Sequence, residues 1–390
     1  MKTHITQKIF TRDFALSFFA QFALSFVFSI LIPTLPIYLE KMGSTGVEIG
    51  VLIGIFSLSS LIFRPFVGRA LLKIPERSFM IAGAVIYTLS SIAYLFAKPF
   101  WPLLILRAFQ GIGMTLFSTA SLTLVTRLSP EANRGKSIGY FYLSYNIAFV
   151  TAPSLGMFLI NSFNFPVLFL VCAFFSSCSF FISLKLEKNR DVPLEDESTQ
   201  DQPFLSYEVL PASIMAFMAS IMWGAMSAFF PLFALSHGVA NPGPFFAIIA
   251  IILIFSRSLG GSVFEIKPRE KVIFPCLSLL IIAMIVLAFS KTSPMFMVVA
   301  VIWGIGHAFI FPSLMNYAID QASSPSGSVI GTYTALSDFG SGVGPVIMGI
   351  ILQLTSYPVM LLCLALTGLI GLLYLYSIVK KKGKDRYANL

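Results

Sequence analysis

The amino-acid sequence predicts an all-α membrane protein with twelve transmembrane helices arranged as two six-helix bundles. The 390 residues are 57% hydrophobic and only 11% charged, whereas a soluble chain carries roughly 25% charged residues. The apolar residues form runs close to the ~20 residues that cross a bilayer core. In addition, glycines and prolines of the first half recur in the second half at a nearly constant spacing.

The twelve expected spans are apolar runs separated by polar breaks. The first run is too long for the apolar part of a signal peptide, so it is expected to remain as a span. The predicted spans are 14–38, 47–66, 78–97, 101–126, 137–160, 163–184, 209–235, 244–263, 272–290, 295–318, 328–354 and 357–379.

Basic residues are unevenly shared between the connectors that alternate along the chain. One set of connectors, which includes both termini, holds 22 of the 26 Lys and Arg, and the other holds only Lys41, Lys98 and Lys291. Basic loops stay in the cytoplasm, so both termini are expected there. The net charge of +9 is explained in this way, and no nucleic-acid partner is expected.

A long polar stretch, 187–208, lies between the sixth and seventh spans and contains two prolines and an acidic cluster. Such a composition is typical of a flexible linker. The predicted domains are therefore a bundle over 1–186, a cytoplasmic linker over 187–208 and a second bundle over 209–390.

The two predicted bundles share landmarks in the same order, which indicates parallel repeats. The matches are Pro36 and Gly43 with Pro231 and Gly238 (offset 195), Arg64 and Gly68 with Arg257 and Gly261 (193), Gly111 with Gly304 (193), and Pro153 with Pro345 (192).

Three segments together resemble the Major Facilitator Superfamily over essentially the whole chain. Arg107-Ala-Phe-Gln110-Gly111-Ile-Gly resembles the helix-four motif of that family, and the segment Gly139–Gly156 around Pro153 resembles its helix-five motif. The stretch 64–77 resembles the loop between helices two and three. The resemblance is to the twelve-helix drug/proton antiporter branch. It implies a transporter that exports a small solute by alternating access, coupled to proton influx.

The helix-two/three loop departs from the family pattern. Leu72 stands where an acidic residue is usual, Pro75 replaces a glycine, and Glu76 stands where a basic residue is common. The cytoplasmic gate is therefore expected to close differently. The residues expected to act in gating are Arg64, Gly68, Arg69, Arg77, Arg257, Pro153 and Pro345.

Three ionisable residues within spans are candidates for substrate binding or proton coupling, because charge inside hydrocarbon is costly. Arg107 is expected ~9 Å inside the fourth span; the alternative is a tether to carbonyls of a neighbouring helix. Asp338 is expected ~16 Å into the eleventh span, near the midplane; the alternative is a hydrogen-bonded helix contact. His307 lies mid-span and titrates near neutrality, although a packed histidine is also common. Asp13 is a further candidate for binding a proton, although a cap at the start of the first helix is the favoured role.

The resemblance also implies that helices one, four, seven and ten line a substrate cavity. Each candidate on these helices has interior packing as its alternative, and Asn146 is a candidate as the repeat mate of Asp338. The remaining candidates for substrate binding or coupling are Gln21, Gln110, Asn146, Trp223, Trp303 and Asn316.

No nucleotide-binding loop, metal-ligand spacing or catalytic triad is found in the sequence. The four cysteines all lie in apolar runs, where packing is the expected role. We therefore expect no enzymatic activity and no cofactor, with a proton gradient as the energy source. A monomer in a bacterial inner membrane is expected, whose partners are a small-molecule substrate, protons and the lipid bilayer. The alternatives are a nutrient importer or uniporter on the same fold, or a lipid scramblase or receptor.

Overall fold

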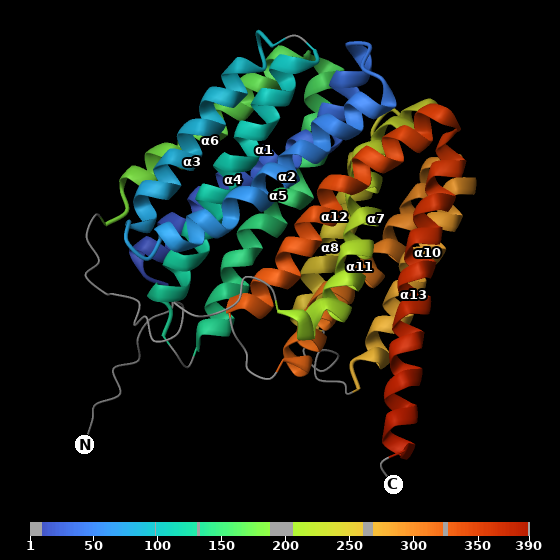
Figure 1. The fold of residues 1–390 in the computed structure, drawn as a ribbon. Coiled ribbons are helices and arrows are strands. Elements are labelled where there is room, and N and C mark those ends of the chain that lie inside the picture. Colours follow the sequence, from blue (N-terminus) through green and yellow to red (C-terminus); the bar gives the residue numbers. More distant parts are fainter. Residues whose placement is uncertain are drawn as a thin grey trace, which may run out of the picture.

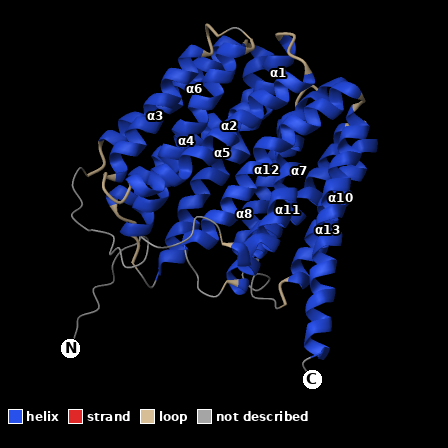
Figure 2. Cartoon of the chain, in the orientation of Figure 1, coloured by secondary structure: helices blue, strands red, loops and turns tan. Residues whose placement is uncertain are grey.

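The protein is described here by a computed structural model that covers residues 10–97, 99–130, 133–187, 206–259, 268–322 and 327–388. These residues form twelve α-helices and one short 3₁₀ turn, with no strand among them (Figure 2). Ten of the helices are long and apolar enough to cross a membrane.

Each of the twelve predicted spans overlaps one helix of the described residues, so the predicted number of helices is confirmed there; the end of the eighth span, 260–263, lies outside them. The helices are α1 (Arg12–Lys41), α2 (Gly46–Ala70), α3 (Glu76–Ala93), α4 (Trp101–Leu128), α5 (Arg134–Ser162), α6 (Phe165–Leu184), α7 (Leu210–Ser236), α8 (Gly243–Leu259), α10 (Glu270–Phe289), α11 (Ser293–Gln321), α12 (Gly327–Leu354) and α13 (Tyr357–Ala388), with the turn η2 (Tyr207–Val209) before α7.

The last helix differs most from its predicted bounds, because α13 continues nine residues past the expected end at 379. The extension runs through a segment whose sequence is basic, so it was not part of the apolar run. Apolar content therefore underestimated the length of α13, although it located the helix correctly.

The helices fall into two groups that lie side by side in Figure 1, α1–α6 in blue to green and α7–α13 in yellow to red. Within the first group the main neighbours are α1–α5, α3–α4 and α3–α6, and within the second they are α7–α12, α10–α11 and α10–α13. The groups meet along α2–α12, α5–α8 and α1–α7. We call the end where α1 begins and α13 ends the terminal end.

Two helices at the other end of the molecule, α1 and α7, stop in the same way. Gly43 and Gly238 follow them with φ of 84° and 77°, the left-handed region that favours glycine. In each case the next residue donates a backbone hydrogen bond of 3.0 Å five positions back, Ser44 to Leu39 and Val239 to Ala234. Such paired caps are the geometry of a Schellman ending, and they occur at positions that the sequence had matched at an offset of 195.

Glycines on one face of α2 bring this helix against α12 across the two groups. Gly46, Gly50 and Gly54 recur every four residues, the spacing of a small-residue helix contact. They face the backbone of α12 at Gly349, Pro345 and Gly342 respectively. The corresponding contact of α5 with α8 places Ser154, next to Pro153, against Gly243. Both predicted gating prolines thus lie in helices that contact the other group.

The end away from the termini is also held by polar bonds between the groups. The backbone N–H of Val47 donates to Oε1 of Gln353 at 3.3 Å, and Nδ2 of Asn161 donates to the carbonyl of Ala240 at 3.2 Å. Together with the glycine contacts, these bonds close the two groups against each other at this end.

Candidate functional site

A cavity of about 80 Å³ lies between the two groups of helices. Its walls come from α1, α2 and α4 of the first group and from α7 and α12 of the second. Most of the wall is apolar, and the polar lining consists of Arg107 and the hydroxyls of Ser57, Ser227 and Ser341. A volume of this size has room for several water-sized groups.

Arg107 is the buried charge on the wall of this cavity, with 7% of its surface exposed. Its Nε donates to the carbonyl of Leu52 on α2 at 3.1 Å, and one terminal nitrogen donates to Oε1 of Gln110 at 2.9 Å. The guanidinium also lies over the ring of Phe56, 4.7 Å from its centroid. Within the described part of the chain, no carboxylate forms an ion pair with Arg107.

Gln110 holds this arrangement from a second direction, because its Oε1 also accepts a 2.8 Å hydrogen bond from the Tyr94 hydroxyl. Both side chains are almost fully buried, and the ring of Tyr94 stacks on Phe169 at 5.0 Å. The sequence analysis identified Arg107 and Gln110 through one motif. It missed Tyr94, which lies at the end of a different helix and carries no motif of its own.

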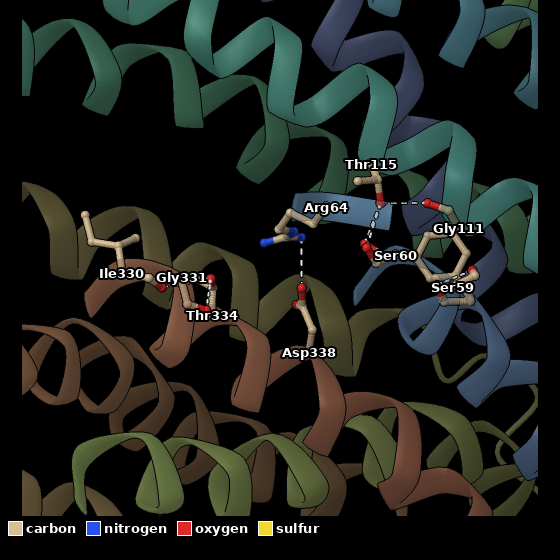
Figure 3. Close-up of polar contacts among 10 residues, drawn as sticks. Ser59, Ser60, Arg64, Gly111, Thr115, Ile330, Gly331, Thr334 and Asp338 are labelled. Carbon is tan, nitrogen blue, oxygen red and sulfur yellow. Dashed lines mark hydrogen bonds and ion pairs between the residues drawn. The ribbon is translucent and has the colours of Figure 1, made fainter. Parts of the chain in front are cut away.

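The glycine of the same motif explains why the arginine reaches α2. A Cβ at Gly111 would collide with the Phe56 carbonyl and the Ser59 hydroxyl, so α4 and α2 approach here only without a side chain. Thr115, one turn further, hydrogen-bonds Ser60 on α2 at 2.7 Å (Figure 3). The close approach places Arg107 within hydrogen-bond distance of the Leu52 carbonyl.

Replacing Gly111 by alanine should therefore separate α4 from α2. Overpacking of this kind costs about 1–3 kcal/mol, and the displaced Arg107 loses its bond to Leu52. We expect a lower unfolding temperature of the purified protein and loss of transport. Gly139→Ala is the matched control, because a Cβ there meets nothing within 4 Å. A Gly111→Ala variant as stable and active as this control would contradict the packing argument.

An ion pair between the two groups joins Arg64 of α2 to Asp338 of α12, with 3.0 Å between a guanidinium nitrogen and Oδ2 (Figure 3). The side chains are 38% and 26% exposed. Arg64 lies six residues before the end of α2, so the pair is on the terminal side of the α2–α12 contact. The sequence had found no acidic partner for the basic residues of the 64–77 loop, and the structure places Asp338 in that position for Arg64.

An aromatic column lies between α7 and α11. The rings of Trp223 and Trp303 are stacked, with 6.4 Å between their centroids. The ring centroid of His307 lies 4.9 Å from that of Trp223 and 6.1 Å from that of Trp303. Trp223 lines the cavity, whereas Trp303 is fully buried behind it. The structure thus brings three of the candidates together, Trp223 at the cavity with Trp303 and His307 next to it.

The other polar candidates lie away from the cavity lining. Gln21 is bonded within the first group, donating to Ser25 at 2.8 Å and accepting from Ser121 at 2.7 Å. Asn146 is buried in α5, and its amide nitrogen has no hydrogen-bond partner among the described residues. Asn316 is half-buried in α11.

The predicted gating loop lies at the terminal end. Arg77 donates to the carbonyl of Leu184 at 2.7 Å, which ties α3 to α6. Gly68 and Arg69 are exposed on α2, and Leu72 is 43% exposed. The side chain of Arg257 lies outside the described residues.

Glu76 has a role that its departure from the family pattern did not suggest. Its Oε1 pairs with Arg127 of α4 at 2.7 Å, and its side chain is only 4% exposed. In the second group, Arg269 pairs with Asp320 of α11 at 2.8 Å. Arg269 follows Glu76 by 193 residues, and Asp320 follows Arg127 by the same number. The same connection between helices is therefore present in both groups with its charges interchanged.

The expectation that Asp13 caps α1 was wrong. The cap is Thr11, whose hydroxyl accepts from the N–H of Phe14 at 3.2 Å. Asp13 is instead buried within the first turn. A threonine directly before the helix is among the preferred N-cap residues, so the sequence contained this signal.

Comparison with known proteins shows the family of the chain. The chain matches the model of the Major Facilitator Superfamily over residues 17–345 and 267–389. The staphylopine export protein of Staphylococcus aureus (strain Mu50 / ATCC 700699) is 25% identical over 368 residues, which covers 90% of this chain and 92% of that protein. The quinolone resistance protein NorA of Staphylococcus aureus (strain COL) is 24% identical over 335 residues, covering 82% and 84%.

Solved structures share the fold at lower sequence identity. The nucleoside transporter NupG superposes with a TM-score of 0.79 at 12% identity, covering 93% of this chain and 99% of that one. A POT family transporter in complex with 5-aminolevulinic acid gives a TM-score of 0.78 at 13% identity, covering 95% and 96%. With the family model matched over most of its length, the chain belongs to the Major Facilitator Superfamily of membrane transporters.

Proposed function

We propose that the protein is a secondary active transporter that exports a small solute by alternating access, coupled to proton influx. The observation that carries the proposal is the cavity between the two groups of helices, with a buried arginine on its wall. Because both groups contribute to the wall, a rocking movement of one against the other would open the cavity to one side at a time. No enzymatic step and no cofactor belong to this function.

The two groups are, in this proposal, repeats of one six-helix bundle, 1–186 and 209–390, joined by the linker 187–208. Two features support this division: the same helix ending at Gly43 and Gly238, and the ion pairs Glu76–Arg127 and Arg269–Asp320 at equivalent positions. Arg64, Arg77 and Arg127 all lie towards the terminal end. By the positive-inside rule, that end faces the cytoplasm of a bacterial cell.

Export is favoured over import by the relatives and by the helix contacts. The two curated relatives are named for staphylopine export and quinolone resistance. The proline-containing helices α5 and α12 also pack against the opposite group, as expected for elements that slide or bend during the exchange of access.

Proton coupling is assigned to the ion pair of Arg64 with Asp338. A proton on Asp338 removes the negative charge that holds Arg64, and this weakens a link between the two groups at the terminal end. Proton binding and the opening of that end are thereby coupled through one side chain. His307, beside Trp223 and Trp303, is the second group proposed to bind a proton.

The test begins with a comparison of metabolites retained by cells that lack the protein and cells that overproduce it. The solute found in this way is then offered to inside-out membrane vesicles with an imposed proton gradient. Asp338→Asn should abolish uphill accumulation in the vesicles, while exchange of labelled for unlabelled solute without a gradient continues. Asp320→Asn is the matched control, since the partner of that carboxylate, Arg269, belongs to the second group.

Full proton-driven export by Asp338→Asn would contradict the coupling proposal. Accumulation of the solute by intact overproducing cells would show an importer or uniporter instead. Movement of lipid between leaflets of protein-containing vesicles without any gradient would show a scramblase.

A further inference from the structure

We propose that the solute carries a single negative charge, an organic carboxylate, which binds to Arg107 in the cavity between α2, α4 and α7. The proposal rests on the proposed function in taking this cavity as the solute site. It adds the chemical class of the solute, which neither the fold nor the helix-four motif specifies.

Among the described residues, Arg107 has no acidic partner on the wall of the cavity. Arg107 is 93% buried, and none of the acidic residues described in the structure lines the cavity. Its present partners are the Leu52 carbonyl, the Gln110 amide oxygen and the face of Phe56. These neutral groups offset part of the free-energy cost of removing a cation from water. A bound anion would in addition neutralise the positive charge. Among the described residues, the positive charge of Arg107 is therefore only partly compensated.

The guanidinium of Arg107 has hydrogen-bonding capacity left for a ligand. The bonds to Leu52 and Gln110 engage two of its five N–H donors. Gln110 is itself fixed by Tyr94, so the guanidinium is held in one orientation before a ligand arrives. A planar donor group held in this way suits a carboxylate, which can accept two parallel hydrogen bonds.

The size and charge of the cavity suit a carboxylate group. A cavity of about 80 Å³ accommodates a carboxylate. Among the described residues, Arg107 is the only basic residue on its wall. A phosphate monoester, with nearly two negative charges at neutral pH, would remain half uncompensated there. The rings of Phe28, Phe56 and Trp223 provide an apolar surface for the rest of the solute.

The test measures binding to the purified full-length protein in lipid nanodiscs. The probes are benzoate, phenylacetate, butyrate and N-acetylglycine, each compared with its own primary amide. Trp223 lines the cavity and reports binding through its fluorescence, in a Trp101→Phe background that removes an exposed tryptophan. We expect wild type to prefer at least one carboxylate over its amide by about ten-fold, the size of one charge-assisted hydrogen bond.

Arg107→Gln should bring each preferred carboxylate within about two-fold of its amide, and Arg107→Lys should keep the preference in weaker form, because a lysine retains charge without the bidentate geometry. Equal binding of acid and amide by wild type across all four pairs would overturn the proposal. So would an unchanged preference in Arg107→Gln.

A second measurement does not depend on the choice of probe or on the folding of an Arg107 variant. Ser57→Asp places a carboxylate in the cavity next to Phe56, and Ser57→Asn is its neutral counterpart of equal size. If the cavity is an anion site, Ser57→Asp should unfold at a higher temperature than Ser57→Asn and should no longer bind the preferred carboxylates. A lower unfolding temperature for Ser57→Asp would overturn the proposal.

These experiments separate the solute class from the proposed transport function. Binding at equilibrium requires neither a gradient nor a direction of transport. A protein that failed to export in vesicles would still show the acid preference if Arg107 binds a carboxylate. A proton-driven exporter of neutral or cationic solutes would export in the vesicles but would show no preference for carboxylates in the binding test.

Discussion

Replacing Gly50 by valine should hold the protein open at the end away from its termini and abolish transport. A Cβ at this position would collide with the carbonyl of Pro345, which is backbone and cannot move aside as a side chain would. The closed contact of α2 with α12 would then cost about 1–3 kcal/mol more than before. A change of this size shifts the balance between closed and open states by about five- to 150-fold.

The shift can be measured with spin labels at Ser44 and Thr355, which lie on either side of this end of the molecule. We expect a longer distance between the labels in Gly50→Val than in wild type, together with loss of solute export. Gly139→Val is the control, because its side chain meets no neighbour within 4 Å. An unchanged distance in a transport-competent Gly50→Val protein would show that the contact tolerates the added volume.

Replacing Glu76 by glutamine should be the most destabilising removal of a charge among the described ion pairs. The substitution leaves Arg127, 17% exposed, without its carboxylate, and breaking a buried pair costs about 3–5 kcal/mol. Asp320→Asn breaks the equivalent pair of the second group, where the aspartate is 34% exposed. Solvent screens such a pair, so a loss of about 1 kcal/mol or less is expected there.

The comparison is made by titrating a denaturing detergent into micelles that contain each variant and measuring the free energy of unfolding. The double variant Glu76→Arg with Arg127→Glu should recover most of the lost free energy of unfolding. Its basic and acidic residues then stand in the same order along the chain as Arg269 and Asp320. Equal losses for Glu76→Gln and Asp320→Asn would show that burial does not decide the strength of these pairs.

The sequence predicted the helix count and positions well because apolar length is the main requirement for crossing a membrane. It also identified Arg107 and Gln110, which lie three residues apart on one helix and are brought together by helical geometry alone. Residues that act in pairs across the fold were harder to predict. Arg64 and Asp338 are 274 positions apart, and nothing local to either one indicates the other.

Two features could have been found from the sequence and were missed. Gly46, Gly50 and Gly54 follow the small-residue spacing that brings membrane helices together, and this pattern predicts a contact face on α2. Glu76 was interpreted only as a departure from a motif. An acidic residue that begins one helix and a basic residue that ends the next, as Arg127 does in α4, are expected to meet across a short antiparallel hairpin.

The interchanged charges of the two equivalent ion pairs have a consequence for assembly during synthesis. Two similar bundles made in succession on one chain risk exchanging helices while they insert into the membrane. If α3 paired with α11 in place of α4, Glu76 would meet Asp320, and α10 paired with α4 would bring Arg269 onto Arg127. Like charges would repel in both mismatched hairpins, so the two ion pairs favour α4 as the partner of α3 and α11 as the partner of α10.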